Sequence, residues 1–410
     1  MNGVGQKFLC GLVCLVAVAS IQAAPAKKRS AVKTEVAKEA AIKRDELPIA
    51  YLSQEQANPQ IQPFHLPTIT DRGVQGARLG IADNNTTGRF TQQGYRLKEV
   101  ILPSDADAAA AFRQLLAEGY RHIVVNLPAE TVAALAKLPD TGDVLIYNVG
   151  SSDDRLRGES CSSKVLHLLP SRAMRADALA QYLAKKRWQK LFLVTGSTEQ
   201  DGLYAASIKR AAQRFGLKIS AEKPWQHTFD ERRTPESEIP VFTQGVEYDV
   251  LVVADETGSF GDYLSYRTWL PRLVAGTQGL VPTAWHYTHE QWGAIQLQNR
   301  FREQAGRWMS EEDYAAWLAV RAIGEAATRS KSVEFDKVKA FMLGDEFALA
   351  GFKGVPLSFR RWDGQLRQPV LLAADHSLVA VAPIEGFLHP KSELDTLGYD
   401  QPETPCHMNQ

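Results

Sequence analysis

From Pro48 onward, short β-branched apolar runs alternate with longer stretches whose apolar residues recur at helical spacing. The expected strands in the first part of this series cover residues 49–53, 95–102, 122–127 and 144–149. Helical patterns lie between them at 73–85, 106–118 and 129–138. Strands that are apolar throughout and separated by helices are typical of a parallel sheet buried on both faces. The pattern therefore predicts one α/β unit that is complete by residue 150.

A second series begins after the polar stretch GSSDDRLRGESCSS, residues 150–163. It predicts helices over 171–188 and 203–215 and strands over 190–196, 217–222, 249–255 and 280–285. The polar stretch is long enough to cross from one folding unit to another. We therefore expect two similar α/β halves that follow one another along the chain.

Two later segments differ from this series. Residues 306–330 have a strong helical pattern, with Ser310 as the expected N-cap and Asp313 three residues later. Trp308 and Trp317 are expected to fill the core beneath this helix, because aromatic side chains at helical spacing usually do so. Residues 358–373 predict a β-hairpin, because Asp363-Gly364 suits a tight two-residue turn.

The stretch IADNNTTGRF, residues 81–90, resembles the start of a calcium-binding loop, because Asp83, Asn85 and Thr87 occupy alternating positions. Such a loop needs a glutamate eleven residues after its first aspartate, and that position is Gly94. Asparagine and glycine also tolerate the left-handed backbone at which helices end. The stretch therefore predicts a helix terminus and a turn rather than a metal site.

The N-terminal residues have the pattern of an export signal. Lys7 precedes the apolar run FLCGLVCLVAVA and the small-residue exit SIQAAPA, and the run is too short to span a bilayer. We therefore predict a signal peptide over residues 1–24 and a charged, solvated leader over 25–46. Neither Cys10 nor Cys14 follows a small residue, so no lipid anchor is expected.

Export leaves two of the four cysteines, Cys161 and Cys406, in the mature chain. An even pair in an oxidising compartment indicates a disulfide, and two unpaired thiols are the alternative. A bridge that closes so long a segment would stabilise the fold by on the order of 5 kcal/mol in the loop-entropy model.

Composition and motifs narrow the function. The 410 residues are 44% apolar and carry 47 basic and 47 acidic side chains, so no global field attracts nucleic acid or membrane. The chain has no nucleophile elbow, P-loop or dinucleotide-binding fingerprint, and Ser151 and Ser197 have no evident histidine partner. His286 and His289 have no third metal ligand nearby. We therefore expect neither an enzyme nor a metal site.

The order of four segments resembles the type I periplasmic solute-binding proteins of ABC transporters, the class that includes branched-chain amino acid receptors. These segments are DRGVQGARLGIADNNTTG, YNVGSSDDRLR, LPSRAMRADALAQYLAKKRWQKLFLVTGSTEQDGLY and GVPLSFRRWDGQLRQPVLL. The resemblance covers roughly residues 48–385. More narrowly, GARLGIADNNTTGRF, LHLLPSRAMRADALAQYL and LDTLGYDQPETPC resemble the subgroup associated with alcohol dehydrogenase systems that depend on pyrroloquinoline quinone (PQQ).

The resemblance implies an α/β fold of two Rossmann-like lobes with parallel sheets, joined by a three-strand hinge. It places lobe 1 at 47–160 and 288–345, lobe 2 at 161–287 and 346–385, and a C-terminal tail at 386–410. It further implies a periplasmic monomer that captures a small solute. PQQ or a related compound is the expected ligand rather than a required cofactor, and an ABC permease or a periplasmic PQQ-dependent dehydrogenase is the expected partner. A receptor for an amino acid or an alcohol-derived metabolite is the alternative.

Polar residues that follow the expected strands are the candidate ligand contacts, because solutes bind beyond the carboxyl ends of parallel strands. Lobe 1 would contribute Ser53, Arg72, Asn148, Ser151, Ser152 and Arg155, and lobe 2 would contribute Thr198, Asp201, Tyr204, Asp255, Trp285 and His286. PQQ is a flat tricarboxylate, so cationic and aromatic groups in this set suit it. Two alternatives remain: a loop hydroxyl can simply cap a helix, and Arg155 can pair with neighbouring acids such as Asp153.

Overall fold

A computed structural model describes residues 44–55, 69–225, 234–406 and 408. The chain divides into two units, Met1–Lys43 and Arg44–Gln410, and only the second unit is described below. The predicted signal peptide and nearly all of the predicted leader lie outside the described residues. Within the described ranges, no helix is both long enough and apolar enough to cross a membrane.

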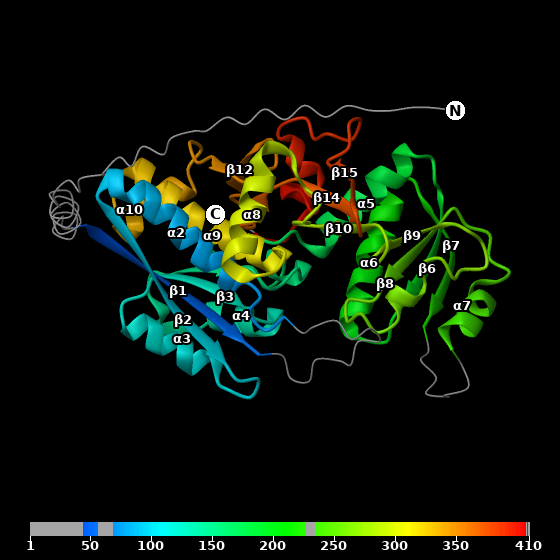
Figure 1. The fold of residues 1–410 in the computed structure, drawn as a ribbon, viewed down its shortest axis with the longest axis horizontal. Coiled ribbons are helices and arrows are strands. Elements are labelled where there is room, and N and C mark those ends of the chain that lie inside the picture. The colour runs from blue at the N-terminus through cyan, green and yellow to red at the C-terminus, as the bar shows by residue number, and fades with distance from the viewer. Residues whose placement is uncertain (1–43, 56–68, 226–233, 407, 409–410) are drawn as a thin grey trace, which may run out of the picture. The chain divides into compact units, whose positions relative to one another are not determined.

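The first sheet has five parallel strands in the order β2-β1-β3-β4-β5. They are β1 (Asp45–Gln54), β2 (Gln93–Leu102), β3 (His122–Asn126), β4 (Leu145–Asn148) and β5 (Val165–His167). Residues of α2 (Val74–Thr91), α8 (Ala294–Ala305), α9 (Glu311–Ser330) and α10 (Phe335–Met342) join the core on one face, and α3 (Ala108–Ala117) and α4 (Ala129–Ala136) cover the other (Figure 1).

Strand β1 is apolar throughout because it is buried on both faces of the sheet. Ile49 and Tyr51 belong to the core on the α9 side of the sheet, whereas Ala50 and Leu52 belong to the core on the α3 side. All four side chains are fully buried. A central parallel strand has no solvent-facing side, so its residues need not alternate.

The second sheet has four parallel strands in the order β7-β6-β8-β9. They are β6 (Lys190–Thr195), β7 (Lys218–Pro224), β8 (Val250–Ala254) and β9 (Leu273–Gly276). Helices α5 (Arg172–Lys185) and α6 (Glu199–Arg214) pack on one face, and α7 (Pro235–Thr243) packs on the other. The first sheet with its helices is called the first lobe, and the second sheet with its helices the second lobe. The predicted fold class is confirmed.

Two small antiparallel sheets complete the fold. One contains β10 (Val281–Thr283), β14 (Val370–Ala374) and β15 (Ser377–Ala382), and the other contains β11 (Leu349–Ala350), β12 (Pro356–Phe359) and β13 (Leu366–Arg367). The apolar cores show where the chain passes between the lobes: from Leu169 to Met174, from Leu280 to Ala284, and from Leu366 to Val370. These three passages are the hinge.

Two predicted lobe boundaries differ from the structure. Val165–His167 form β5 of the first sheet, so the first lobe continues past residue 160. Leu349, Leu357 and Leu366 lie in the core of the first lobe, so residues 346–367 do not belong to the second lobe. The predicted tail is partly a packed segment, because Leu397 lies in the second core. A short apolar strand can join either of two neighbouring cores, and its sequence does not say which.

The helix terminus expected within residues 81–90 is wrong, because α2 continues to Thr91 and ends at Gln92, which has a left-handed backbone. Asn85 instead holds the neighbouring strand: its side chain accepts from Tyr95 N and donates to Tyr95 O, both at 2.9 Å. A Cβ on Gly88 would lie 2.1 Å from Gln93 O. Asn85 therefore binds the backbone of β2, and Gly88 allows the helix to approach Gln93 closely. Neither residue ends the helix.

Helix α9 begins as predicted, with a capping box between Ser310 and Asp313. Trp317 is buried in the core, but Trp308 precedes the helix and is 44% exposed, so its predicted core position is wrong. The predicted hairpin is present as β12 and β13, yet its turn spans residues 360–365 instead of two residues. Arg360 N donates to Gln365 O at 2.8 Å and closes this wider turn.

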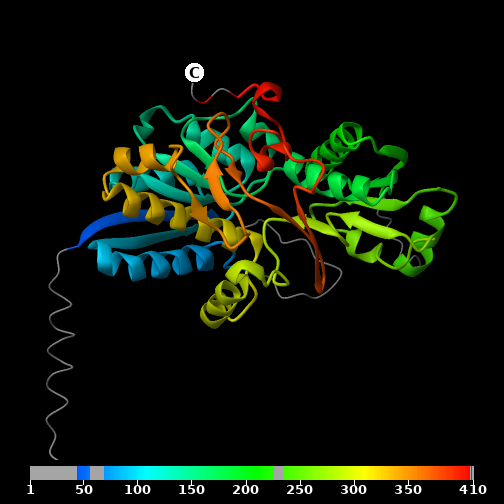
Figure 2. The ribbon, with the colours of Figure 1, turned by 90° about the horizontal axis from the view of Figure 1, so that it is seen from above.

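The structure joins Cys161 and Cys406 in a disulfide, with Cα atoms 5.9 Å apart. The two cysteines are 245 residues apart in the chain. The bridge links the segment between β4 and β5 to the C-terminal segment, which lies beside both lobes in red in Figure 2.

The crossing of α2 and α9 depends on glycine, because a Cβ on Gly76 would lie 1.8 Å from Asp313 O. We expect Gly76→Ala to lower the free energy of unfolding by about 2–3 kcal/mol, since the helices must move apart. Gly202 in α6 has open space around its Cβ position, so Gly202→Ala should raise stability by roughly 0.5–1 kcal/mol. Urea unfolding of both variants would measure this, and equal effects would contradict the argument.

Burial lowers the pKa of His122 to about 3. The unfolded chain takes up a proton near pH ~6.5, whereas the folded ring stays neutral, so acid favours unfolding. Stability should therefore fall by about 1.4 kcal/mol per pH unit from this residue between about pH 6 and pH 4. In His122→Gln the slope of unfolding free energy against pH should decrease by that amount. An unchanged slope in His122→Gln would contradict this explanation.

Candidate ligand-binding site

The segment after β4 forms a tight loop whose shape is set by Asn148. Its Oδ1 accepts from Ser151 N at 2.9 Å, and its Nδ2 donates to Ser151 O at 2.8 Å. Ser151 Oγ in turn accepts from Asp153 N at 3.3 Å. Asn148 is fully buried and Ser151 is 8% exposed. Both predicted contact residues therefore hold the loop in shape, and this presents Ser152 to the second lobe.

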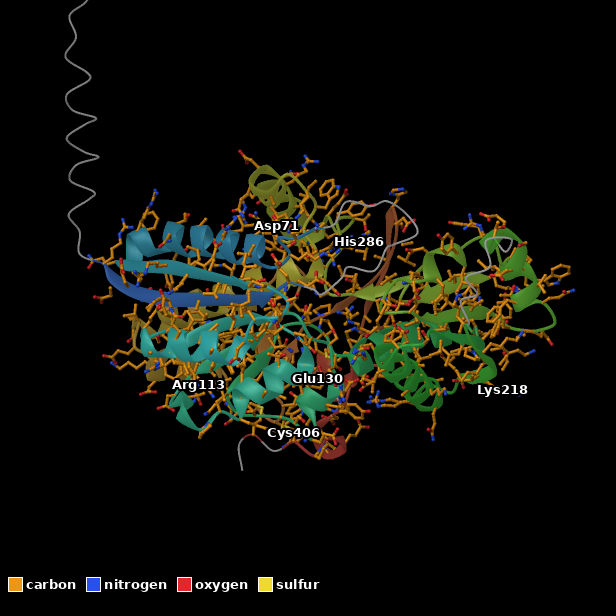
Figure 3. All side chains as sticks on the ribbon, turned by 90° about the horizontal axis from the view of Figure 1, so that it is seen from below. Asp71, Arg113, Glu130, Lys218, His286 and Cys406 are labelled. Carbon is orange, nitrogen blue, oxygen red and sulfur yellow. A yellow bond between two sulfur atoms is a disulfide. The ribbon has the colours of Figure 1, made fainter. Side chains whose placement is uncertain are left out.

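Arg155 lies at the end of this loop and bonds to acids of both lobes. Its guanidinium contacts Asp153 at 2.8 Å, Glu130 at 3.0 Å and Glu199 at 3.3 Å. Glu130, labelled in Figure 3, lies on α4 of the first lobe, and Glu199 begins α6 of the second. Asp153 raises the pKa of Arg155 further. Pairing with neighbouring acids, the alternative from sequence, is what the structure shows.

Three predicted contacts from the second lobe organise backbone. Thr198 and Asp201 form the capping box of α6, and Asp201 Oδ1 also accepts from Glu256 N at 2.8 Å. Asp255 accepts from Phe260 N at 2.8 Å and from Gly261 N at 2.7 Å. Asp201 and Asp255 are fully buried. Their carboxylates already have donors, so they position the loops after β6 and β8.

Trp285 does not provide a stacking surface, because it is 2% exposed and stacks on Tyr314 with ring centroids 4.3 Å apart. His286 contacts Thr288 Oγ1 at 2.8 Å through Nδ1, and burial lowers its pKa. Residues 280–285 were expected to form a strand whose carboxyl end, with Trp285 and His286, faces the ligand. Packing of Ala284 and Trp285 into the first core takes the tryptophan away from the strand ends.

Ser53 and Arg72 lie in the first lobe, apart from the β4 loop along the sheet. Ser53 is near the end of β1 and is mostly buried. The side chain of Arg72 is 50% exposed and lies 3.7 Å from Glu312, which begins α9 with Glu311. Arg72 is therefore a loosely held cation at the N-terminal end of α2 and α9.

The strongest convergence of the two lobes lies around two arginines that the sequence did not single out. Arg175 Nη2 on α5 donates to Ser152 Oγ at 3.1 Å and to Glu311 Oε1 at 2.9 Å, both in the first lobe. Arg172 bonds to Glu256 at 2.6 and 2.8 Å and lies 3.2 Å from Asp153. Both arginines occupy the first turn of the helix that directly follows a hinge passage. A cation in the first turn of a helix that follows a passage between lobes is the sequence signal that could have identified them.

Tyr204 of α6 lies close to this group. Its side chain is 2% exposed, and its hydroxyl has no hydrogen-bond partner among the described residues. Burial raises the pKa of Tyr204, and the charges of Arg175, Glu256 and Glu311 also act on it. A buried hydroxyl without a partner is costly, so it is available to a polar group that enters this region. Ser152, Arg155 and Tyr204 are thus the predicted residues that the structure brings to the same interlobe region.

One large cavity, of about 630 Å³, lies elsewhere in the described structure. Its walls include Phe359, Trp362 and Arg367 near the β12–β13 turn and Gln401 of the C-terminal segment. None of the predicted contact residues lines it. The described residues also contain no group of three or more potential metal ligands.

Residues 68–228 match a family model described as periplasmic binding protein. The chain has the type I periplasmic binding protein fold. A branched chain amino acid ABC transporter periplasmic ligand-binding protein from Burkholderia xenovorans LB400 has a TM-score of 0.69 and 14% identity, over 89% of this chain and 100% of that one. No relative was found among curated protein sequences.

Two further solved structures share the type I fold with different ligands in their descriptions. A leucine-, isoleucine-, valine-, threonine- and alanine-binding protein from Brucella ovis has a TM-score of 0.62 and 15% identity, over 83% of this chain and 95% of that one. A solute binding protein from R. palustris, in complex with benzoate, has a TM-score of 0.62 and 11% identity, over 88% and 99%. Such low identities establish the fold and leave ligand identity to the residues themselves.

The bond between Arg175 and Glu311 should join the lobes energetically. We expect Arg175→Met to lower the free energy of unfolding by about 2 kcal/mol, since Glu311 then loses a charged donor in a partly buried position. Adding Glu311→Gln should restore part of that loss. Chemical unfolding of the single and double variants measures the coupling, and strictly additive losses would show that the two side chains do not interact.

Proposed function

We propose that this chain is a periplasmic solute-binding protein that captures a small ligand between its two lobes and delivers it to an ABC transporter. The observation that carries this proposal is the contact of Arg175 in the second lobe with Ser152 and Glu311 in the first. Ser152 follows β4 of the first sheet, and Glu256, which bonds to the neighbouring Arg172, follows β8 of the second sheet. In α/β folds ligands bind beyond such strand ends. The fold and the descriptions of its structural neighbours support the same function.

The mechanism follows from the hinge. A ligand that contacts both lobes stabilises the arrangement in which they are together, and a membrane partner can distinguish that arrangement from the open one. This is a binding function without a chemical step. The protein acts as a monomer, with a permease as its partner and no nucleic acid. Delivery to a periplasmic PQQ-dependent dehydrogenase is the second possibility for the partner, and it rests on the subgroup resemblance.

We infer that the ligand is a small carboxylate, with PQQ or a related aromatic acid as the leading compound. Glu256 and Glu311 are already bonded to Arg172 and Arg175, so a ligand ammonium would have to displace an arginine from either acid. A carboxylate can instead accept from the unpartnered Tyr204 hydroxyl and share an arginine. The description of the R. palustris protein, which names benzoate, supports an aromatic acid as the ligand class.

An amino acid is the second candidate, and Glu312 favours it. Burial and the neighbouring Glu311 raise the pKa of Glu312, and Arg72 is its weak ion-pair partner at 3.7 Å. A ligand ammonium could therefore replace Arg72 at this carboxylate without breaking a close pair. The descriptions of the B. xenovorans and Brucella ovis proteins name amino acids as well.

Calorimetric titration with PQQ, benzoate and leucine separates these candidates. We expect PQQ or benzoate to bind and leucine to bind at least about tenfold more weakly, a difference of about 1.4 kcal/mol. Tight binding of leucine alone would replace the carboxylate proposal with the amino acid receptor. Absence of binding by all three, together with failure to copurify with a permease, would contradict the proposed function.

Tyr204 offers a sharper variant, because its hydroxyl has no hydrogen-bond partner to lose in the part of the chain that the structure describes. We expect Tyr204→Phe to leave the unfolding free energy unchanged or slightly higher, yet to weaken the bound carboxylate about tenfold by removing one donor worth about 1–1.5 kcal/mol. Tyr248, buried on the α7 side of the second sheet, provides the matched control. Tyr248→Phe should not change affinity, and equal affinity in the two variants would exclude Tyr204 from the site.

A further inference from the structure

The C-terminal segment Leu394–Cys406, here called the strap, contacts both lobes over a few residues. On the second lobe, Leu397 enters the core, and Gly398 is held by three side chains of α5 and α6. Gly398 N donates to Asp177 Oδ2 at 2.9 Å, while Gly398 O accepts from Arg210 at 2.8 Å and Arg214 at 2.7 Å. Arg210 also lies over the Tyr399 ring, 4.1 Å from its centroid.

The fit at Gly398 is specific to glycine. Its φ is +81°, and a Cβ would lie 2.7 Å from Met174 Cγ. Asp177, which binds its amide, is fully buried and is paired with both arginines. The strap therefore has a specific binding site on the second lobe, here called its seat, in which Gly398 is closely packed.

The strap is also anchored to the first lobe at its C-terminal end. Thr404 Oγ1 donates to Arg157 O at 2.9 Å, and Cys406 forms the disulfide with Cys161. Arg157 and Cys161 lie in the segment between β4 and β5, which carries Ser152 and Arg155 at its other end. The covalent anchor of the strap is thus on the same segment that faces the second lobe.

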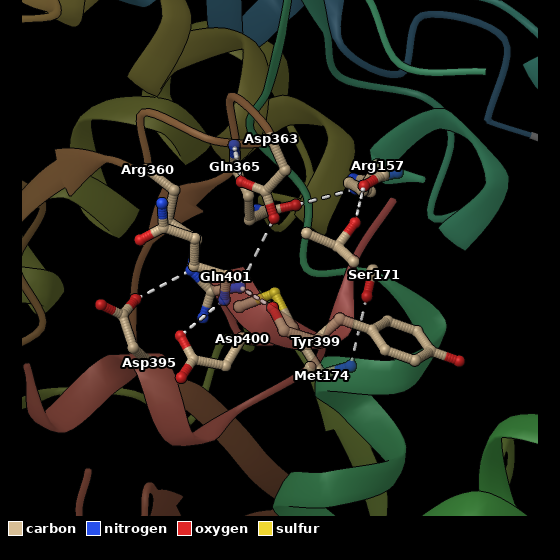
Figure 4. Close-up of polar contacts among 12 residues, drawn as sticks. Arg157, Ser171, Met174, Arg360, Asp363, Gln365, Asp395, Tyr399, Asp400 and Gln401 are labelled. Atoms are coloured by element: carbon tan, nitrogen blue, oxygen red, sulfur yellow. Dashed lines mark hydrogen bonds and ion pairs between the residues drawn. The ribbon is translucent and has the colours of Figure 1, made fainter. Parts of the chain in front are cut away.

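Just before Gly398, the strap also contacts the turn between β12 and β13, which belongs to the first lobe. Arg360, buried in the turn before β13, donates to Leu397 O at 2.8 Å and pairs with Asp395 at 2.9 Å. Figure 4 shows Arg360, Asp395 and Tyr399 together with Arg157 and Gln365 of the hinge region. Arg367 of the third hinge passage also bonds to Asp395, at 2.9 Å. The strap is therefore fixed to the first lobe on both sides of Gly398 and lies against the hinge.

The strap has little slack. Between Gly398 and Thr404 its one compact element is the 3-10 turn Gln401–Glu403. A residue advances by ~2.0 Å in a 3-10 helix and by ~3.3 Å when extended, so unwinding this turn would lengthen the strap by roughly 4 Å. Once the strap is fully extended, further separation of the β4–β5 segment from α5 and α6 must detach Gly398 or break the disulfide.

We propose that the disulfide-anchored strap is a mechanical stop that limits how far the two lobes move apart at this edge. While Cys161 and Cys406 are joined, the β4–β5 segment stays within a few ångströms of its seat on the second lobe, and hinge motion pivots about this edge. Cleavage of the bridge by a dithiol reductant, which is oxidised to its own disulfide as the two protein thiols form, releases the stop. The proposal concerns the ligand-free hinge and does not depend on the identity of the ligand.

Interlobe distances measured by pulsed electron resonance test the stop without using cysteine labels. Spin labels on p-acetylphenylalanine at Arg113 of α3 and Lys218 of β7 report on the two lobes, and both positions are exposed and labelled in Figure 3. We expect the distance distribution of the ligand-free protein to widen and to extend to longer distances in the Cys161→Ser/Cys406→Ser variant. An unchanged distribution would overturn the proposal.

The second anchor gives an independent prediction. Arg210→Met/Arg214→Met removes the donors to Gly398 and should widen the distribution as the cysteine variant does. Both changes act on the same strap, so combining them should widen the distribution by less than the sum of the two separate effects. Additive widening would mean that the segment acts by general stabilisation. If the cysteine variant fails to fold, reduction of the folded wild-type chain with dithiothreitol provides the same comparison, with circular dichroism to confirm that both lobes remain intact.

Discussion

The arrangement of the two lobes depends on buried side chains that satisfy backbone groups where the chain passes between them. Gln365 Nε2 donates to His167 O and Leu169 O, and Gln368 Nε2 donates to Leu168 O, so two hinge passages are held side by side. Lys353, also buried, donates to Gln368 Oε1 at 2.7 Å. Passages that leave one sheet for another lose their strand partners, and buried carbonyls without donors would be costly. These amides supply the missing donors.

The same hinge region positions the polar groups of both lobes. Arg157 is buried, and burial lowers its pKa to about 10, yet it donates to Leu169 O and to the β4 loop at Asp153 O. Arg172 and Arg175 follow the first passage immediately and meet acids of the opposite lobe. Charges that cross between lobes are thus placed by the hinge, and a ligand has to compete with or extend an existing network.

The ion pairs between the lobes and the strap both restrict the movement of one lobe relative to the other, but they do so in different ways. Ion pairs between lobes can exchange partners when a ligand enters, because each bond is worth only a few kcal/mol. The disulfide cannot exchange in this way without a reductant. The disulfide therefore limits the separation of the lobes at one edge. The polar groups around Arg175 and Tyr204 can still change their partners. Such a division would leave the ligand contacts free to select the closed state while the hinge geometry stays restricted.

Local sequence was sufficient for features that depend on neighbouring residues. Runs such as VVN within β3 and LVVA within β8 predicted buried parallel strands, and Ser310 with Asp313 predicted the start of α9, because burial on both faces and end capping leave a local pattern. The pairing of Cys161 with Cys406 followed from counting. The same residue type can have several structural roles, and only the tertiary structure decided which role a given side chain has. Asn85 bonds a strand and does not end a helix, Trp285 packs in a core, and Arg172 and Arg175 reach across the lobes. The reason is physical: a capping pattern is complete within one turn, whereas the partner of a long polar or aromatic side chain is set by contacts between segments far apart in the chain.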